Sequence, residues 1–205
     1  MLIGFALSWS AHSEQDMTEQ QLNTIEQKYN KFARQRVIDW QQLIQDNQDL
    51  PEQEKSNRVN AFFNANVQFI NDQALWEQKD YWATPIETLS IGGGDCEDYA
   101  IAKYFTLKQL GVDESKLRLT YVKAIELNQA HMVLTYFENK RAVPLVLDNL
   151  IIEIKYASQR TDLIPVYSFN GSGLWLTKPK ENQRVSDAAH LSLWQNLLLR
   201  IRNGH

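Results

Sequence analysis

Hydrophobic residues in the first third of the chain recur at helical spacing. Between residues 16 and 48 they fall three or four positions apart, with Trp40 among them, which predicts one amphipathic helix. Pro51, followed closely by two glutamates, is typical of the start of a second helix, because proline suits the first helical position and acids suit its positive end. The apolar spacing predicts that this second helix covers residues 51–70.

The pattern is interrupted before a third helical segment. Residues 80–95 contain Pro85 and three consecutive glycines, a composition typical of a connection without regular structure. Small and apolar residues return at helical spacing from Cys96 to Leu110, and Gly111 suits the position just after a helix end. We therefore expect a glycine-rich turn that leads directly into a helix.

The period of the apolar positions changes to two in the second half of the chain, which predicts β-strands. The expected strands are 116–123, 130–137, 143–147, 165–169 and 174–176. The end of the chain, residues 186–201, returns to helical spacing. Because helices and neighbouring strands are segregated along the sequence, the predicted fold class is α+β with an antiparallel sheet.

The composition is typical of a soluble, folded domain. Of its 205 residues, 43% are hydrophobic and 22% are charged, which is enough apolar material for one core. The net charge is −4, and without a basic stripe the sequence speaks against nucleic acid as a partner. The apolar start is too short to span a bilayer, so the chain is not expected to be transmembrane. Residues 1–15 are a possible signal remnant or a ragged end, and residues 16–205 are expected to form a single domain.

Cys96 is the chain's one cysteine, and its surroundings favour reactivity. It stands at a predicted helix start, where Asp95 is a natural N-cap and backbone N–H groups favour thiolate over thiol. The preceding glycines allow a peptide to approach closely. The adjacent acids Glu97 and Asp98 oppose the thiolate unless a cation offsets them. The alternative is a small buried hydrophobic residue.

Asp95, Glu97 and Asp98 place three carboxylates within four residues. Hard oxygen ligands suit calcium, although the spacing is not that of an EF-hand loop. The same acids also suit a metal-free helix start, where they cap the helix and complement its dipole. The local chemistry leaves both interpretations open.

His131 and Asp148 follow Cys96 in an order that suits thiol catalysis. A histidine activates the thiol and a carboxylate orients the imidazole. His131 lies in one predicted strand and Asp148 ends the next, so adjacent antiparallel strands would let the two side chains meet. Taken singly, His131 is as easily a core histidine and Asp148 a turn residue. The other histidines lie near the chain ends or in the last predicted helix: His12, His190 and His205.

Three sequence blocks carry a family resemblance: GGGDCEDYA, AHMVLTY and VPLVLDN. Together they resemble the LapG family of bacterial transglutaminase-like cysteine proteinases, over roughly residues 20–200. The resemblance implies a papain-like, transglutaminase-like core with a helical N-terminal lobe. It also implies that Cys96 is the nucleophile, His131 the general base and Asp148 the orienting acid.

The resemblance further implies a metal, a substrate and a regulator. Asp95, Glu97 and Asp98 match the acids that bind Ca²⁺ in the family, and members are periplasmic, calcium-dependent endopeptidases. They cut a large surface adhesin near its N-terminus at a pair of alanines, which releases the adhesin and disperses biofilm. An inner-membrane cyclic di-GMP receptor of the LapD type holds the protease when the nucleotide is abundant.

Two other functions use the same residues or the same fold. A transglutaminase-like acyl transferase would pass the acyl group to an amine instead of water. A non-catalytic binding module would keep the fold without the activity, although the presence of Cys96, His131 and Asp148 speaks against it.

Overall fold

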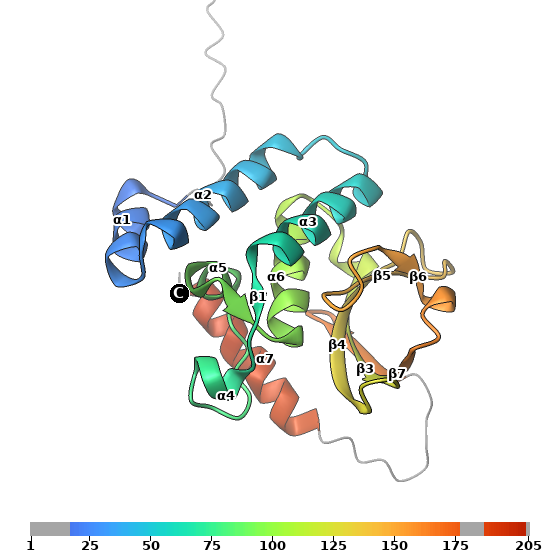
Figure 1. Ribbon diagram of the computed structural model, residues 1–205. Helices are drawn as coiled ribbons and strands as arrows, with labels where there is room; N and C mark the ends of the chain where they lie inside the picture. Colours follow the sequence, from blue (N-terminus) through green and yellow to red (C-terminus); the bar gives the residue numbers. More distant parts are fainter. Residues whose placement is uncertain (1–16, 177–186, 204–205) are drawn as a thin grey trace, which may run out of the picture.

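Helices form most of the first half of the chain and a curved sheet forms most of the second half (Figure 1), in a computed structural model that describes residues 17–176 and 187–203. Residues 1–15, expected to be a signal remnant or a ragged end, lie outside the described residues. The helices are α1 (Glu19–Lys28), α2 (Lys31–Asp46), α3 (Glu52–Asn66), α4 (Asp72–Leu75), α5 (Pro85–Ile91), α6 (Cys96–Gln109) and α7 (Asp187–Arg202).

The strands form two sheets of unequal size. Their bounds are β1 (Gln68–Phe69), β2 (Gly93–Gly94), β3 (Leu117–Ala124), β4 (Gln129–Tyr136), β5 (Leu145–Leu147), β6 (Lys155–Tyr156), β7 (Leu163–Asn170) and β8 (Gly173–Leu176). The larger sheet has the order β6-β5-β4-β3-β7-β8, and every neighbouring pair in it is antiparallel. The predicted α+β class and the antiparallel sheet are confirmed.

Helix α6 is the centre of the main core. It is buried on nearly all sides, and its buried positions include the charged residues Asp98 and Lys103 beside the apolar ones. Leu119 and Leu134 of the sheet, both fully buried, belong to the same cluster. The indole N–H of Trp40 donates to the Thr106 hydroxyl at 2.8 Å, which ties α2 to α6. The opposite face of the sheet holds a second, small cluster around Val133.

The prediction of one helix over residues 16–48 is wrong, because α1 and α2 are separate helices. Asn30 lies between them as the N-cap of α2, and its side-chain oxygen accepts hydrogen bonds from the N–H groups of Phe32 and Ala33 at 2.9 and 3.0 Å. An asparagine that satisfies these free donors favours a new helix start over continuation. The helix predicted over 51–70 also ends early, at the last residue of α3.

The expectation of an irregular connection over residues 80–95 is wrong in its centre, where α5 forms. Thr84 and Glu87 make a capping box, and Pro85 occupies the first helical position. Proline there starts a helix and does not break one. Gly92 ends α5 in the left-handed region, at φ 73°, a conformation that glycine adopts without strain.

The glycine run positions Cys96 through a short parallel pair. Strand β2 pairs with β1 in the register Gln68 to Gly93, and α6 begins one residue after Asp95. A side chain at Gly94 would place its Cβ 2.7 Å from the Cβ of Asp98, so only glycine fits there. These contacts therefore fix the start of α6 to the helical part of the fold, independently of the large sheet.

Candidate active site

Cys96 is the first residue of α6, with Asp95 at the N-cap position as predicted. Its side chain is half-buried and lines a cleft of about 260 Å³. The thiol donates to a carboxylate oxygen of Glu97 at 2.9 Å. Burial, and then the charge of Glu97, raises the pKa of the Cys96 thiol well above its usual range. The helix start alone therefore does not give a thiolate in this arrangement.

His131 and Asp148 meet across neighbouring strands, as the strand pattern predicted. His131 is in β4, and Asp148 follows β5 directly. Leu134 pairs with Leu147, so continuing this register puts Asp148 on the same face of the sheet as His131. The imidazole Nε2 lies 2.8 Å from the Asp148 Oδ1 atom, and both residues are buried.

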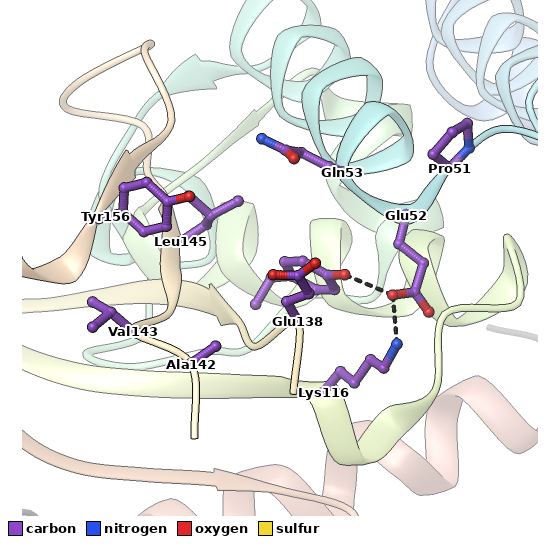
Figure 2. A pocket seen from close by; sticks show the side chains of 10 residues that line it. Pro51, Glu52, Gln53, Lys116, Glu138, Ala142, Val143, Leu145 and Tyr156 are labelled. Carbon is purple, nitrogen blue, oxygen red and sulfur yellow. Dashed lines mark hydrogen bonds and ion pairs between the residues drawn. The ribbon is translucent and has the colours of Figure 1, made fainter. Parts of the chain in front are cut away.

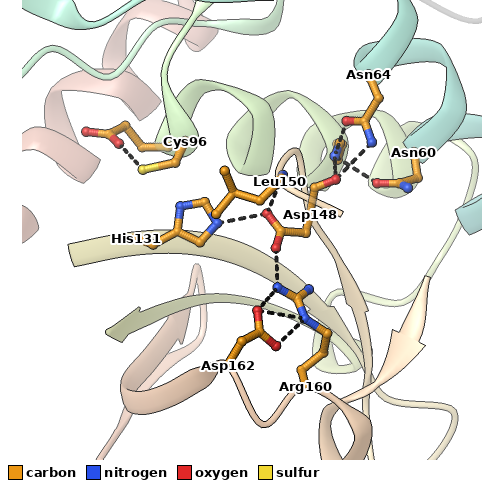
Figure 3. Close-up of polar contacts among 10 residues, drawn as sticks. Asn60, Asn64, Cys96, His131, Asp148, Leu150, Arg160 and Asp162 are labelled. Carbon is orange, nitrogen blue, oxygen red and sulfur yellow. Dashed lines mark hydrogen bonds and ion pairs between the residues drawn. The ribbon is translucent and has the colours of Figure 1, made fainter. Parts of the chain in front are cut away.

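The three side chains predicted for catalysis lie next to one another in the order Cys96, His131, Asp148. Figure 3 shows His131 between Cys96 and Asp148, with its second ring nitrogen on the side that faces Cys96. Cys96 and His131 line the same cleft, together with Trp82, Tyr121 and other residues of β1, β4 and the α4–α5 connection. This geometry can orient an imidazole beside a thiol that a substrate reaches from solvent.

Asp148 has a hydrogen-bond partner on each carboxylate oxygen. Its Oδ1 atom accepts from His131 and from the Leu150 N–H, and its Oδ2 atom accepts from Arg160 at 2.7 Å. Burial by itself raises the pKa of Asp148, but hydrogen bonds from His131, Leu150 and Arg160 outweigh burial and lower it to about 2. Asp148 is therefore ionised at neutral pH.

The backbone of Asp148 is held from the helical side by a buried cation. The Nζ atom of Lys103 in α6 donates to the Asp148 carbonyl at 3.0 Å and to the side-chain oxygens of Asn60 and Asn64, each at 2.8 Å. Burial lowers the pKa of Lys103 to about 7. Three acceptors around one amine satisfy the three protons of the ammonium form.

Lys103→Met is expected to lower the free energy of unfolding by about 2–4 kcal/mol, because buried acceptors then lose their donor. Asn64 still donates to the Asp148 carbonyl, so the cost falls mainly on Asn60 and Asn64. Urea unfolding measures it, with Lys108→Met as the matched control. Lys108 is partly exposed and pairs with Glu114, so its loss is expected to cost less than about 1 kcal/mol. Equal losses in the two variants would contradict this account of Lys103.

The three predicted metal-binding acids lie beside two further acids, Asp72 and Asp80, which the sequence pattern does not indicate. Asp72 lies in a group with Asp95 and Asp98, and also in a group with Asp80 and Glu97, with ligand atoms within 4.8 Å of one another in each group. Asp72 begins α4, and its only local signal is an acid in a helix's first turn. The chain fold, and not the local sequence, brings Asp72 and Asp80 to this place.

The acid cluster has the properties of a cation site. Burial, and then the charge of Glu97, raises the pKa of Asp95 to about 9, and burial also raises the pKa of Glu97, Asp98 and Asp72. Among the described residues, one buried oxygen each of Asp72 and Asp95 has no hydrogen-bond partner. Buried carboxylate oxygens that repel one another and lack hydrogen-bond donors are suitable ligands for calcium.

Asp98 differs from the other acids. Its two oxygens accept hydrogen bonds from the Ala83 and Asp95 N–H groups, at 2.8 and 3.2 Å. Asp98 thus joins the α4–α5 connection to the start of α6. Asp98 therefore caps the helix as well as lying in one of the acid groups, while Asp95 and Asp72 each have a buried oxygen without a hydrogen-bond partner.

A larger cleft of about 550 Å³ lies at the start of α3 and shares no lining residue with the cleft of Cys96. Figure 2 shows Glu52 on its wall beside Lys116. A carboxylate oxygen of Glu52 accepts from Lys116 and from the Tyr136 hydroxyl, each at 2.6 Å. These polar groups satisfy one another and link α3 to β4 and to the 3-10 helix Glu114–Lys116 that precedes β3. We therefore assign this cleft a structural role and place the candidate chemistry at Cys96.

In the part of the chain that the structure describes, no helix is both long and apolar enough to cross a membrane. A sequence model of the bacterial transglutaminase-like cysteine proteinases matches residues 21–176. No curated protein matches the chain. Three solved structures of Legionella pneumophila LapG, one calcium-bound and one EGTA-treated, are 41% identical to it with a TM-score of 0.75. The matches cover 88–89% of this chain and 96–98% of the solved chains. The chain belongs to the bacterial transglutaminase-like cysteine proteinases.

Proposed function

We propose that this protein is a calcium-dependent, periplasmic cysteine endopeptidase that cuts a large surface adhesin. The cut would fall at a di-alanine site near the adhesin's N-terminus, release the adhesin and promote biofilm dispersal. One observation carries the proposal: Cys96 and His131 share a cleft, and Asp148 is bonded to His131, in a chain of this family. An inner-membrane cyclic di-GMP receptor of the LapD type would regulate the enzyme by holding it.

The roles of the three residues follow from their positions. Cys96, as thiolate, attacks the scissile carbonyl, and His131 protonates the leaving amine. Water activated by His131 then hydrolyses the acyl-enzyme. Asp148 accepts a hydrogen bond from the Nε2–H group and so leaves the other ring nitrogen of His131 to exchange a proton with Cys96. The backbone N–H of Cys96, at the helix start, would donate to the oxyanion.

The thiol must change its partner before this reaction. Cys96 donates to Glu97 in the present structure, and a proton held there is not shared with His131. Ca²⁺ would be held by the acid cluster, which consists of Asp95, Glu97 and Asp98 with Asp72 and Asp80. Its positive charge would keep carboxylates ionised and would favour a thiolate nearby. Glu97, once engaged as a ligand, no longer competes for the thiol proton.

Cleavage of a purified adhesin N-terminal fragment tests the substrate class. The enzyme in calcium is expected to cut a fragment that contains a di-alanine site, and to leave intact a matched fragment in which both alanines are replaced by leucine. Addition of the full-length receptor loaded with cyclic di-GMP is expected to stop the reaction. Equal cutting of both fragments would contradict the di-alanine specificity, and cutting unaffected by receptor would contradict the proposed regulation.

A further inference from the structure

Arg160 is a buried cation directly behind the candidate catalytic centre. It follows the short 3-10 helix Ala157–Gln159 between β6 and β7, and its side chain is 1% exposed. Its Nη2 atom donates to the Asp148 Oδ2 atom at 2.7 Å. Figure 3 shows the resulting line of side chains, from Arg160 through Asp148 to His131.

Asp162 holds Arg160 from the other side. The Nε and Nη2 atoms of Arg160 donate to the two Asp162 oxygens at 2.9 and 2.8 Å. Asp162 is more exposed than Asp148, with 28% of its side chain accessible compared with 0%. The guanidinium therefore connects a buried carboxylate, which needs a fixed partner, to a carboxylate that solvent reaches.

We propose that Arg160 is a positioning residue of the catalytic centre, which fixes the Asp148 carboxylate so that its Oδ1 atom faces His131. The inference rests on the proposed peptidase function and names a fourth residue for it. Sequence spacing gives no sign of Arg160, because it lies in an irregular stretch after β6. Only the fold places it next to Asp148.

Each Asp148 oxygen has a separate task in this arrangement. Because Oδ2 is bonded to Arg160, rotation of the carboxylate would break that bond, and Oδ1 therefore stays available to His131. A guanidinium remains charged at all working pH values. The Nε and Nη2 atoms of Arg160 together hold Asp162, and Nη2 alone gives Asp148 one charged hydrogen bond, which fixes its Oδ2 atom. Among the described residues, the Nη1 atom of Arg160 is buried and has no hydrogen-bond partner. Arg160 thus keeps this placement although one of its own groups stays unsatisfied.

A purely structural role would make a different prediction. Arg160 would then serve only to anchor the loop between β6 and β7 through Asp162. Asp162→Asn separates the two roles, because it weakens the anchor and leaves the Arg160–Asp148 bond in place. A second control is Arg118→Met. Arg118 stacks on Trp175 and Phe137, with its guanidinium carbon 4.0 and 4.6 Å from their ring centroids, and is not part of the site.

Steady-state cleavage of the adhesin fragment in calcium is the first measurement. Arg160→Met is expected to lower kcat by roughly 10²-fold with KM within about twofold, because substrate binding is untouched while the imidazole loses its orientation. Arg160→Lys, which keeps the charge but not the fork, is expected to recover most of that loss. Asp162→Asn and Arg118→Met should stay within about threefold of wild type. An Asp162→Asn loss equal to that of Arg160→Met would overturn the proposal.

Proton NMR of the substrate-free proteins gives a second, independent measurement. The Nε2–H proton of His131, bonded to a buried carboxylate, is expected to give a downfield imidazole signal. We expect this signal to be lost or broadened in Arg160→Met and kept in Arg160→Lys, Asp162→Asn and Arg118→Met. An unchanged signal in Arg160→Met would overturn the proposal even if the enzyme proves to act on another substrate. Failure of wild type to cleave, with the signal lost only in Arg160→Met, would instead contradict the proposed substrate.

Discussion

Cys96→Ala is expected to reduce cleavage of the adhesin fragment by roughly 10⁵-fold or more, because no acyl-enzyme can form without the sulphur. The fold should remain, because the substitution removes only the sulphur, which bonds to Glu97 and to the Met132 backbone and lines a cleft that solvent reaches. The measurement is kcat/KM beside the midpoint of thermal unfolding, which should move by no more than a few degrees.

His131→Ala is the matched control for this loss. It removes the general base but keeps the thiol, and triad members act as a unit, so its activity should fall to a similarly low level. Cleavage by Cys96→Ala above the background without enzyme would show that another residue carries the chemistry. A folded Cys96→Ala protein with no activity, beside an active wild type, supports the assigned nucleophile.

Calcium withdrawal is expected to have the second largest effect. In EGTA, burial and the charge of Glu97 raise the pKa of Asp95 to about 9, far above its value in an unfolded chain. The folded state then binds more protons than the unfolded state between roughly pH 4 and pH 9, so its stability falls as pH rises through this window. We expect the free energy of unfolding in EGTA to be roughly 1–3 kcal/mol lower at pH 8 than at pH 6.

Calcium should reverse this loss, because a cation among the acids favours their ionised forms. At calcium concentrations about 100-fold above Kd, binding to the folded state adds about 2.7 kcal/mol of stability. Asp95→Asn is expected to weaken calcium binding, measured by titration calorimetry, and to flatten the pH dependence in EGTA. Asp39→Asn, in which an acid bonded to Gln35 on the surface of α2 is changed, should do neither. Identical calcium binding by Asp95→Asn and wild type would refute the assignment of the acid cluster.

The parts of the fold that could be predicted are those with a regular apolar period. The strands of the large sheet other than β6, which was not predicted, have such a period, as does α6. Their order placed His131 and Asp148 on neighbouring strands. The errors fall where one residue has two structural uses. Pro85 starts α5, because Thr84 and Glu87 form a capping box around it. Asn30 caps α2 and so divides a segment that the apolar spacing alone predicts as one helix.

The candidate site was predictable only in its local part. The block around Cys96 shows its acids in the sequence, because all three lie within four residues at one helix start. Asp72, Asp80 and Arg160 have no such signal, since long-range packing brings them to the site from other segments. The thiol's bond to Glu97 was also not foreseen, although the adjacent acids had indicated that something must offset their charge.

Intact-mass spectrometry of the adhesin fragment, before and after incubation with wild type in calcium, tests the central claim most directly. The proposed peptidase produces two fragments whose masses add up to that of the substrate plus one water, and neither fragment is expected in EGTA or with Cys96→Ala. A product heavier than the substrate would indicate acyl transfer to an amine. That product, or an unchanged substrate mass with folded, calcium-loaded enzyme, would contradict the assignment as an endopeptidase of this adhesin.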